Sequence, residues 1–107
     1  MIQVTFKKNS RGLITQFEVK GHASFAPRGE DIVCAAVSAL TQTAVMSLEK
    51  IAGLEPDVQV TDGYLSCRLP EVPGAGKIEV SVIMDSMALG LEETAENYPG
   101  YLRIYYK

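Results

Sequence analysis

The chain has 107 residues, of which 47% are hydrophobic and 21% charged, values typical of one globular domain and not of a disordered segment. Ten lysines and arginines against thirteen aspartates and glutamates give a net charge of −3, which offers no broad electrostatic attraction to nucleic acid. No apolar run approaches the roughly 18 residues needed to cross a bilayer, and the alternating start Met1–Lys7 is unlike a signal peptide. We therefore expect a single domain over residues 1–107 in the cytoplasm, with no direct contact with nucleic acid or membrane.

Two kinds of periodicity divide the chain into elements. Apolar and polar residues alternate where a strand is half buried, as in Ile2, Val4 and Phe6, and apolar residues recur every three or four positions where a helix has one buried face. The first half predicts, in order, a strand over residues 2–7, a turn at 9–12, a strand at 13–19, a loop at 21–29 and a helix that begins near residue 30 or 31 and stops at Gly53. The second half predicts a strand around residues 58–60, a tight turn at 62–63, a strand at 64–69, a loop at 70–76, a second helix up to Pro99 and a last strand at 102–106.

The start of the second helix is the boundary that the pattern fixes least, because Ile78, Val80 and Val82 also alternate like a strand. The length of the segment favours a helix. The resulting order is β-β-α-β-β-α-β, which predicts a two-layer α+β domain with helices packed against a mostly antiparallel or mixed sheet. Ile78, Val82 and Leu89 lie off the main apolar stripe of this helix. Either a second copy of the chain covers them in a homodimer, or the helix is buried on two sides within one chain.

Three side chains with nucleophilic or metal-binding capacity stand out: His22, Cys34 and Cys67. They are too few for a four-ligand zinc site within one chain, so we expect no metal site, the alternative being a site shared by two subunits. No cofactor is expected. Free thiols are the default in a reducing cytosol. Cys67 alternates with Leu65 and Leu69 on one strand face, which predicts a core residue.

Cys34 falls near the start of the first helix, at the edge of its apolar stripe. The unpaired N–H groups and partial positive charge of a helix start favour a thiolate, which is the nucleophilic form. Asp31, Cys34 and Ser38 share one helix face through their i, i+3, i+7 spacing. His22 precedes Cys34 by twelve residues in a glycine-bearing loop that can fold back onto the helix. A Cys–His pair is the minimum apparatus for acyl transfer, and the N–H groups of the helix start are candidates to hold the oxyanion.

Each of these residues also has an ordinary structural interpretation. A lone cysteine in a helix is most often a small buried residue, and a lone histidine is most often a surface or capping residue. Asp31 fits a helix-start acid as well as a third catalytic group. Ser38 fits a solvated or helix-bonded hydroxyl. Phe25 is either an apolar lid over a cleft or an isolated loop aromatic.

The segments G-H-A-S at 21–24 and G-E-D-I-V-C-A-A-V-S-A-L at 29–40 closely resemble the signature of the ribosomal-processing cysteine protease family, called Prp. Length and element order extend the resemblance to the whole chain, although the second half matches only in pattern. The resemblance implies a small cytoplasmic homodimeric endopeptidase with Cys34 as nucleophile and His22 as general base. It implies supporting positions for Asp31 and Ser38, and it places Gly21 at the edge of a mobile loop that closes over the substrate.

The implied substrate is the short N-terminal extension of the large-subunit ribosomal protein numbered twenty-seven, cut after a pair of aromatic residues. A mildly acidic enzyme suits a basic ribosomal partner, and an aromatic pair requires an apolar cleft. The sequence departs from the family pattern in the bulkier, stiffer loop over residues 24–28 and at Ala36, where glycine is frequent. These departures affect the expected loop mobility and cleavage preference, and they leave the two reactive residues in place.

Two other functions fit the same residues. The first is a non-catalytic, ribosome-associated module that binds the same peptide without cutting it. The second is a redox sensor, in which Cys34 would require Cys67 as its resolving thiol.

Overall fold

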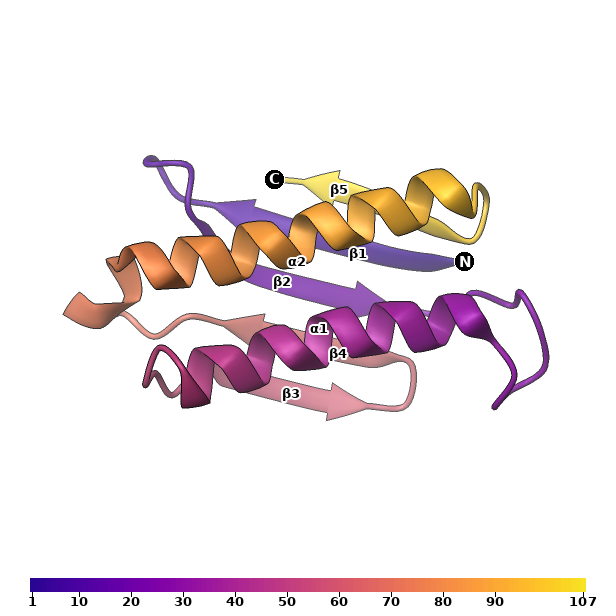
Figure 1. Cartoon of the computed structure of the whole chain (residues 1–107), viewed down its shortest axis with the longest axis horizontal. Helices are drawn as coiled ribbons and strands as arrows, with labels where there is room; N and C mark the ends of the chain where they lie inside the picture. Colours follow the sequence, from indigo (N-terminus) through magenta and orange to yellow (C-terminus); the bar gives the residue numbers. More distant parts are fainter.

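The computed structural model describes residues 1–107 and confirms the predicted order of elements (Figure 1). The elements are β1 (Ile2–Lys8), β2 (Ile14–Lys20), α1 (Ile32–Lys50), β3 (Asp57–Thr61), β4 (Tyr64–Arg68), α2 (Ile78–Asn97) and β5 (Leu102–Tyr106). A short 3₁₀ helix, η1 (Pro73–Gly76), lies inside the predicted loop before α2. The second helix includes all of the ambiguous alternating segment, so the interpretation from length is confirmed.

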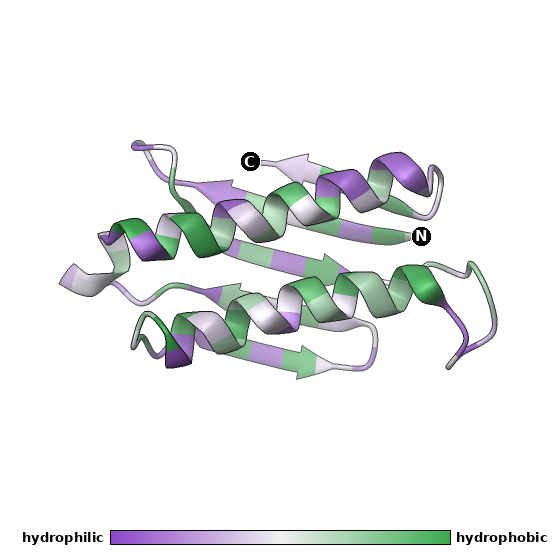
Figure 2. Cartoon of the chain, viewed as in Figure 1, coloured by the Kyte–Doolittle hydropathy of each residue, from purple (hydrophilic) through white to green (hydrophobic).

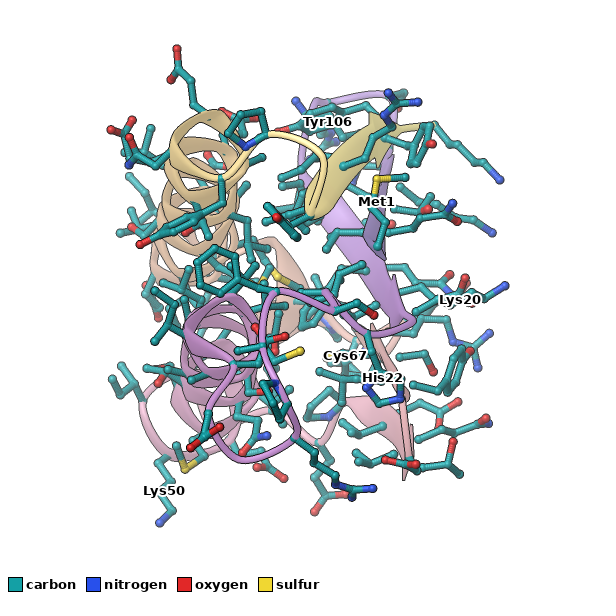
Figure 3. The ribbon with its side chains drawn as sticks, turned by 90° about the vertical axis from the view of Figure 1, so that its right-hand side faces the viewer. Met1, Lys20, His22, Lys50, Cys67 and Tyr106 are labelled. Atoms are coloured by element: carbon teal, nitrogen blue, oxygen red, sulfur yellow. The ribbon has the colours of Figure 1, made fainter.

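The five strands form one mixed sheet in the order β3-β4-β2-β1-β5. The β1–β2, β2–β4 and β3–β4 pairs are antiparallel, and β1–β5 is parallel. Both helices cover the same face of this sheet, which gives two layers (Figures 1 and 3). The α+β fold class predicted from the sequence is therefore confirmed.

The core lies between the helices and the inner face of the sheet. Phe6 and Phe17 are register partners on β1 and β2, and neither has any exposed surface. Cys67 on β4 pairs with Phe17 and is also fully buried, as predicted. Green and purple segments alternate along the central strands in Figure 2, as expected where one face is covered and the other meets water.

The two helices approach closely where α2 carries a glycine. A Cβ added at Gly90 would lie 2.8 Å from Cδ2 of Leu40 on α1, so only glycine lets Leu40 pack there without displacement. The outward face of α2 has no such cover, because Ile78, Val82 and Leu89 are 78%, 56% and 68% exposed. The alternative of burial on two sides within one chain is therefore wrong, and an apolar face of α2 is free.

One feature of α1 departs from the expectation about membranes. An 18-residue stretch of this 19-residue helix has a mean hydropathy of 1.5, so by length and composition alone the helix could cross a bilayer. Its buried residues recur along one face and pack against the sheet, which is how the core helix of a two-layer domain also behaves: Val33, Val37, Thr41, Ala44 and Leu48. The criterion is weak evidence for a membrane span here.

Candidate active site

Asp31 fixes the start of the helix that carries Cys34. Its backbone is extended and its Oδ1 accepts hydrogen bonds from the N–H groups of Val33 and Cys34, both at 3.0 Å. An aspartate in this geometry is an N-cap, which satisfies donors that have no partner inside the helix. The helix therefore begins at Ile32, just after the predicted start, and Cys34 lies in its first turn.

The second oxygen of Asp31 binds the loop that precedes the helix. Oδ2 accepts from the N–H groups of Phe25 at 2.9 Å and Ala26 at 3.4 Å. The hydrogen bond from the Cys34 N–H lowers the pKa of Asp31, desolvation opposes it, and the N–H groups of Phe25, Ala26 and Val33 lower the pKa further. Both oxygens are thus engaged by main-chain donors, and the carboxylate ties the loop to the helix start.

Three of the helix-start donors are consequently not free to hold an oxyanion. The N–H groups of Val33 and Cys34 bind the Asp31 side chain, and the N–H of Ala35 binds the Asp31 carbonyl oxygen at 3.0 Å. The expectation that helix-start groups would serve a substrate oxygen is therefore wrong for these three N–H groups in this arrangement, and it remains a prediction for the N–H of Ile32. The donor that does reach the reactive sulfur comes from the loop, since the Ala23 N–H lies 3.4 Å from the half-buried Sγ of Cys34.

His22 follows the end of β2 and is held against the β3–β4 turn. The preceding N–H, on Gly21, donates to the carbonyl oxygen of Gly63 at 2.8 Å. The imidazole itself lies against the same glycine, because a Cβ added at Gly63 would be 2.8 Å from Nε2. Figure 3 shows the His22 side chain beside the pink β3–β4 pair, on the sheet side of the molecule. In this arrangement the imidazole makes no hydrogen bond with the thiol of Cys34.

Gly21 is confined by its surroundings. Its φ of +92° is the left-handed region that favours glycine, and a Cβ would lie 2.7 Å from the carbonyl oxygen of Met1. Substitution at this position would therefore displace the main chain of Met1 or of residue 21 itself, which directly precedes His22.

A cleft of about 930 Å³ brings the predicted residues together between α1 and the β3–β4 hairpin. The five residues that the sequence analysis placed at or beside the reactive pair line it: Gly21, His22, Asp31, Cys34 and Ser38. Ser38 is exposed one turn beyond Cys34 on α1. Sequence reasoning missed the opposite wall, which contains Val60, Asp62 and Gly63. The Asp-Gly pair was visible as a turn, but nothing local indicated that this turn would meet His22.

The loop before α1 is held by contacts with two other parts of the molecule, the end of α2 and the turn between β3 and β4. Phe25 packs edge-on against Tyr98 and Tyr101, with ring centroids 5.5 and 5.0 Å away. Arg28 forms an exposed ion pair with Asp62 at 3.5 Å. Phe25 does not line the cleft. It is therefore neither a lid over the cleft nor an isolated aromatic; it fastens the loop to the end of α2 and the start of β5.

We expect a Gly63→Ala substitution to displace the His22 imidazole, because the new Cβ would occupy the space that Nε2 borders. The matched control is Gly53→Ala: Gly53 has φ +70° against +68° at Gly63, but a Cβ there meets nothing within 4 Å. The chain has one histidine, so its ring signals in an NMR spectrum are unambiguous. The nuclear Overhauser contacts between the ring and residue 63 should change in the first variant and persist in the second. Unchanged ring signals in Gly63→Ala would show that the contact is absent in solution.

Acid should weaken the anchoring of the loop through Asp31. Because its pKa in the folded chain is below the ordinary 3.8, ionised Asp31 stabilises the fold above that value, and this contribution is lost as the pH falls through the lowered pKa. Asp31→Asn keeps a capping oxygen but loses the second acceptor, so it should melt below wild type at neutral pH and converge with it as the pH falls through the lowered pKa of Asp31. Thermal melts across this range, with the neighbour variant Glu30→Gln as a control for charge, measure the difference. Parallel curves for wild type and Asp31→Asn at every pH would contradict it.

Comparison with known proteins places this site in a defined family. The family model for cysteine protease Prp matches residues 1–103. The ribosomal processing cysteine protease Prp of Bacillus subtilis is 34% identical, and the match covers 97% of this chain and 96% of that protein. The Prp of Staphylococcus aureus is 29% identical over the full length of both chains.

Solved structures agree with the sequence relatives. The crystal structure of the S. aureus ribosomal processing protease Prp with a covalently linked product peptide has a TM-score of 0.92, at 29% identity and full coverage of both chains. The structure of SMU.848 from Streptococcus mutans has a TM-score of 0.87 at 33% identity, covering 99% of this chain and 93% of that one. The match of the family model over nearly the whole chain, together with these relatives, means that the chain belongs to the Prp family of ribosomal processing cysteine proteases.

Proposed function

We propose that this protein cleaves peptide bonds with Cys34 as nucleophile and His22 as general base and acid. The observation that carries the proposal is that the only histidine and a half-buried thiol at a helix start line one cleft, with the residue after the histidine donating its N–H to the thiol sulfur at 3.4 Å. An N–H directed at sulfur stabilises the negative charge that the sulfur carries as a nucleophile.

The reaction proceeds through an acyl-enzyme. His22 takes the proton of the Cys34 thiol, and the sulfur attacks the scissile carbonyl carbon to form a C–S bond. The C–N bond then breaks as His22 gives that proton to the departing amine. A water molecule then attacks the thioester, His22 accepts a proton from it, and the carboxylic acid product leaves as the thiolate re-forms. Pairing requires the imidazole to turn from Gly63 toward Cys34. The exposed His22 side chain on the loop beside the thiol has the freedom for this rotation.

We propose as substrate the N-terminal extension of the large-subunit ribosomal protein numbered twenty-seven, cut after an aromatic pair. The family is one of ribosomal processing proteases, and the S. aureus relative has been crystallised with a substrate peptide and with a covalently linked product peptide. The apolar side chains of the cleft suit aromatic residues, and the net charge of −3 suits a basic ribosomal protein. We place this activity in the cytoplasm, where ribosomes assemble.

The test is incubation of the purified protein with a peptide that spans the extension and its junction, followed by mass spectrometry. Cleavage after the aromatic pair is the expected result. Binding of the intact peptide without turnover would instead support the alternative of a non-catalytic, ribosome-associated peptide-binding module. Cleavage elsewhere, or of unrelated peptides at equal rate, would overturn the proposed substrate.

We also propose that the chain acts as a homodimer through the free apolar face of α2. Ile78, Val82 and Leu89 repeat on one side of the helix, and a second copy presenting the same face would remove them from water. Val82→Glu should convert the dimer to a monomer by placing a charge in that contact, while Ile51→Glu, at a 72% exposed position outside the face, should not. Sedimentation equilibrium measures the oligomeric state of both variants. A wild-type protein that sediments as a monomer would refute the dimer.

A further inference from the structure

The strand that borders the cleft is an edge of the sheet. β3 pairs with β4 on one side and has no neighbour on the other. The main-chain groups along a free edge can pair with another extended chain. Val60 pairs in register with Leu65, which is buried in the core, yet Val60 is 66% exposed. An apolar side chain that points toward the helix layer is thus left uncovered beside an open strand edge.

The cleft runs along this edge from the thiol. On α1 its wall extends through successive turns from Cys34 to Met46, which is 48% exposed. Facing it, β3 contributes Val58, Val60 and Thr61. Met46 lies twelve residues beyond Cys34 in the helix, a distance of about 18 Å at 1.5 Å per residue. An extended peptide rises about 3.3 Å per residue, so roughly five residues span the groove.

The direction of the groove follows from the topology. α1 and β3 run in opposite directions, and the helix start lies at the same end as the β3–β4 turn (Figure 1). A peptide whose residues before the scissile bond fill the groove therefore enters beside Met46 and reaches Cys34 in the direction in which β3 itself runs. Such a peptide would pair with β3 as a parallel strand.

We propose that the substrate binds as a sixth, parallel strand on the free edge of β3, with about five residues before the scissile bond in the groove between α1 and β3. Alternate side chains of this strand face Val60 and Met46, and the intervening ones face the open side of the sheet. Main-chain hydrogen bonds to β3 supply the register that brings the scissile carbonyl to Cys34. This binding mode rests on the proposed peptidase function and specifies how its substrate is held.

The pairing predicts a pattern that backbone methylation detects. In a series of otherwise identical peptides, each N–H before the scissile bond is methylated in turn, and affinity for the Cys34→Ala protein is measured by fluorescence anisotropy. Methylation at every second position should weaken binding roughly tenfold, the cost of about one hydrogen bond, and the positions between should bind like the parent peptide. Because this assay needs no turnover, it reads out docking even if the proposed cleavage fails. Losses without a period of two would overturn the β3 pairing.

A matched pair of variants tests the groove from the protein side. Val60→Glu places a charge between β3 and Met46 and should weaken binding of the parent peptide at least roughly tenfold. Val72→Glu makes the same change at a 48% exposed valine outside the cleft and should leave affinity unchanged. Shortening the peptide from its N-terminus should leave affinity constant until fewer than about five residues precede the scissile bond. Equal affinities of the two variants, or loss of affinity only on shortening after the scissile bond, would place the peptide elsewhere.

Discussion

Replacing Cys34 by serine is expected to abolish cleavage of the extension peptide, with a loss in kcat of roughly a thousandfold or more. A serine hydroxyl gives up its proton far less readily than a thiol, so at neutral pH His22 would leave it almost entirely in its weakly nucleophilic neutral form. His22→Ala should cause a loss of roughly a hundredfold or more, because the leaving amine then departs without a positioned acid. Initial rates from chromatographic separation of the peptide products measure both effects.

The control for this substitution is Cys67→Ala. Cys67 is fully buried on β4 and does not line the cleft, so its removal should leave kcat and KM close to wild type while lowering stability through the small cavity it creates. Undiminished cleavage by Cys34→Ser would eliminate the proposed mechanism. Equal losses in the Cys34 and Cys67 variants would show that unfolding, and not chemistry, caused them.

The second large expected effect is a difference in reactivity between the two thiols. Burial raises the pKa of Cys67 to about 12, with smaller contributions from the carboxylates of Glu49 and Asp57. Cys67 is therefore a neutral thiol throughout the neutral range, and only a thiolate reacts with iodoacetamide. In the native protein Cys34 should be alkylated at least about a thousandfold faster than Cys67, and denaturant should make the rates similar.

Peptide mapping of protein quenched at successive times measures this ratio, with Cys34→Ala as the variant that should remain unlabelled in its native state. Comparable labelling of Cys67 in the folded wild type would contradict its burial. An unreactive Cys67 would also argue against the redox-sensor hypothesis, because a resolving thiol has to reach Cys34 and Cys67 is held in the core.

Local patterns predicted most of the architecture. Alternation along β1 and the 3.6-residue period of α1 reflect which faces the strands and helices bury, and both are properties of neighbouring residues. The order β3-β4-β2-β1-β5 was beyond such reasoning, since it depends on pairing between segments far apart in the chain. The pairing of Lys20 with Tyr64 is what carries His22 to Gly63, and no feature near residue 22 encodes it.

In the candidate site, too, short-range features could be predicted and contacts between distant segments could not. The helix start, its acid and the position of the thiol followed from short-range spacing and from the family motif. The hydrogen bonds from the loop N–H groups of Phe25 and Ala26 to Asp31 did not, because they depend on how the loop folds back. The role of Phe25 was likewise undecidable, since its partners Tyr98 and Tyr101 belong to the other end of the chain.

The most direct test of the central claim is the identification of the residue that becomes acylated during turnover. The protein is mixed with a slowly hydrolysed ester of the extension peptide, quenched in acid within the first turnover, digested and analysed by mass spectrometry. We predict an acyl group of the mass of the segment before the scissile bond on the peptide that contains Cys34. Product formation with no acyl group on Cys34 at any time, or with the group on another residue, would contradict the account.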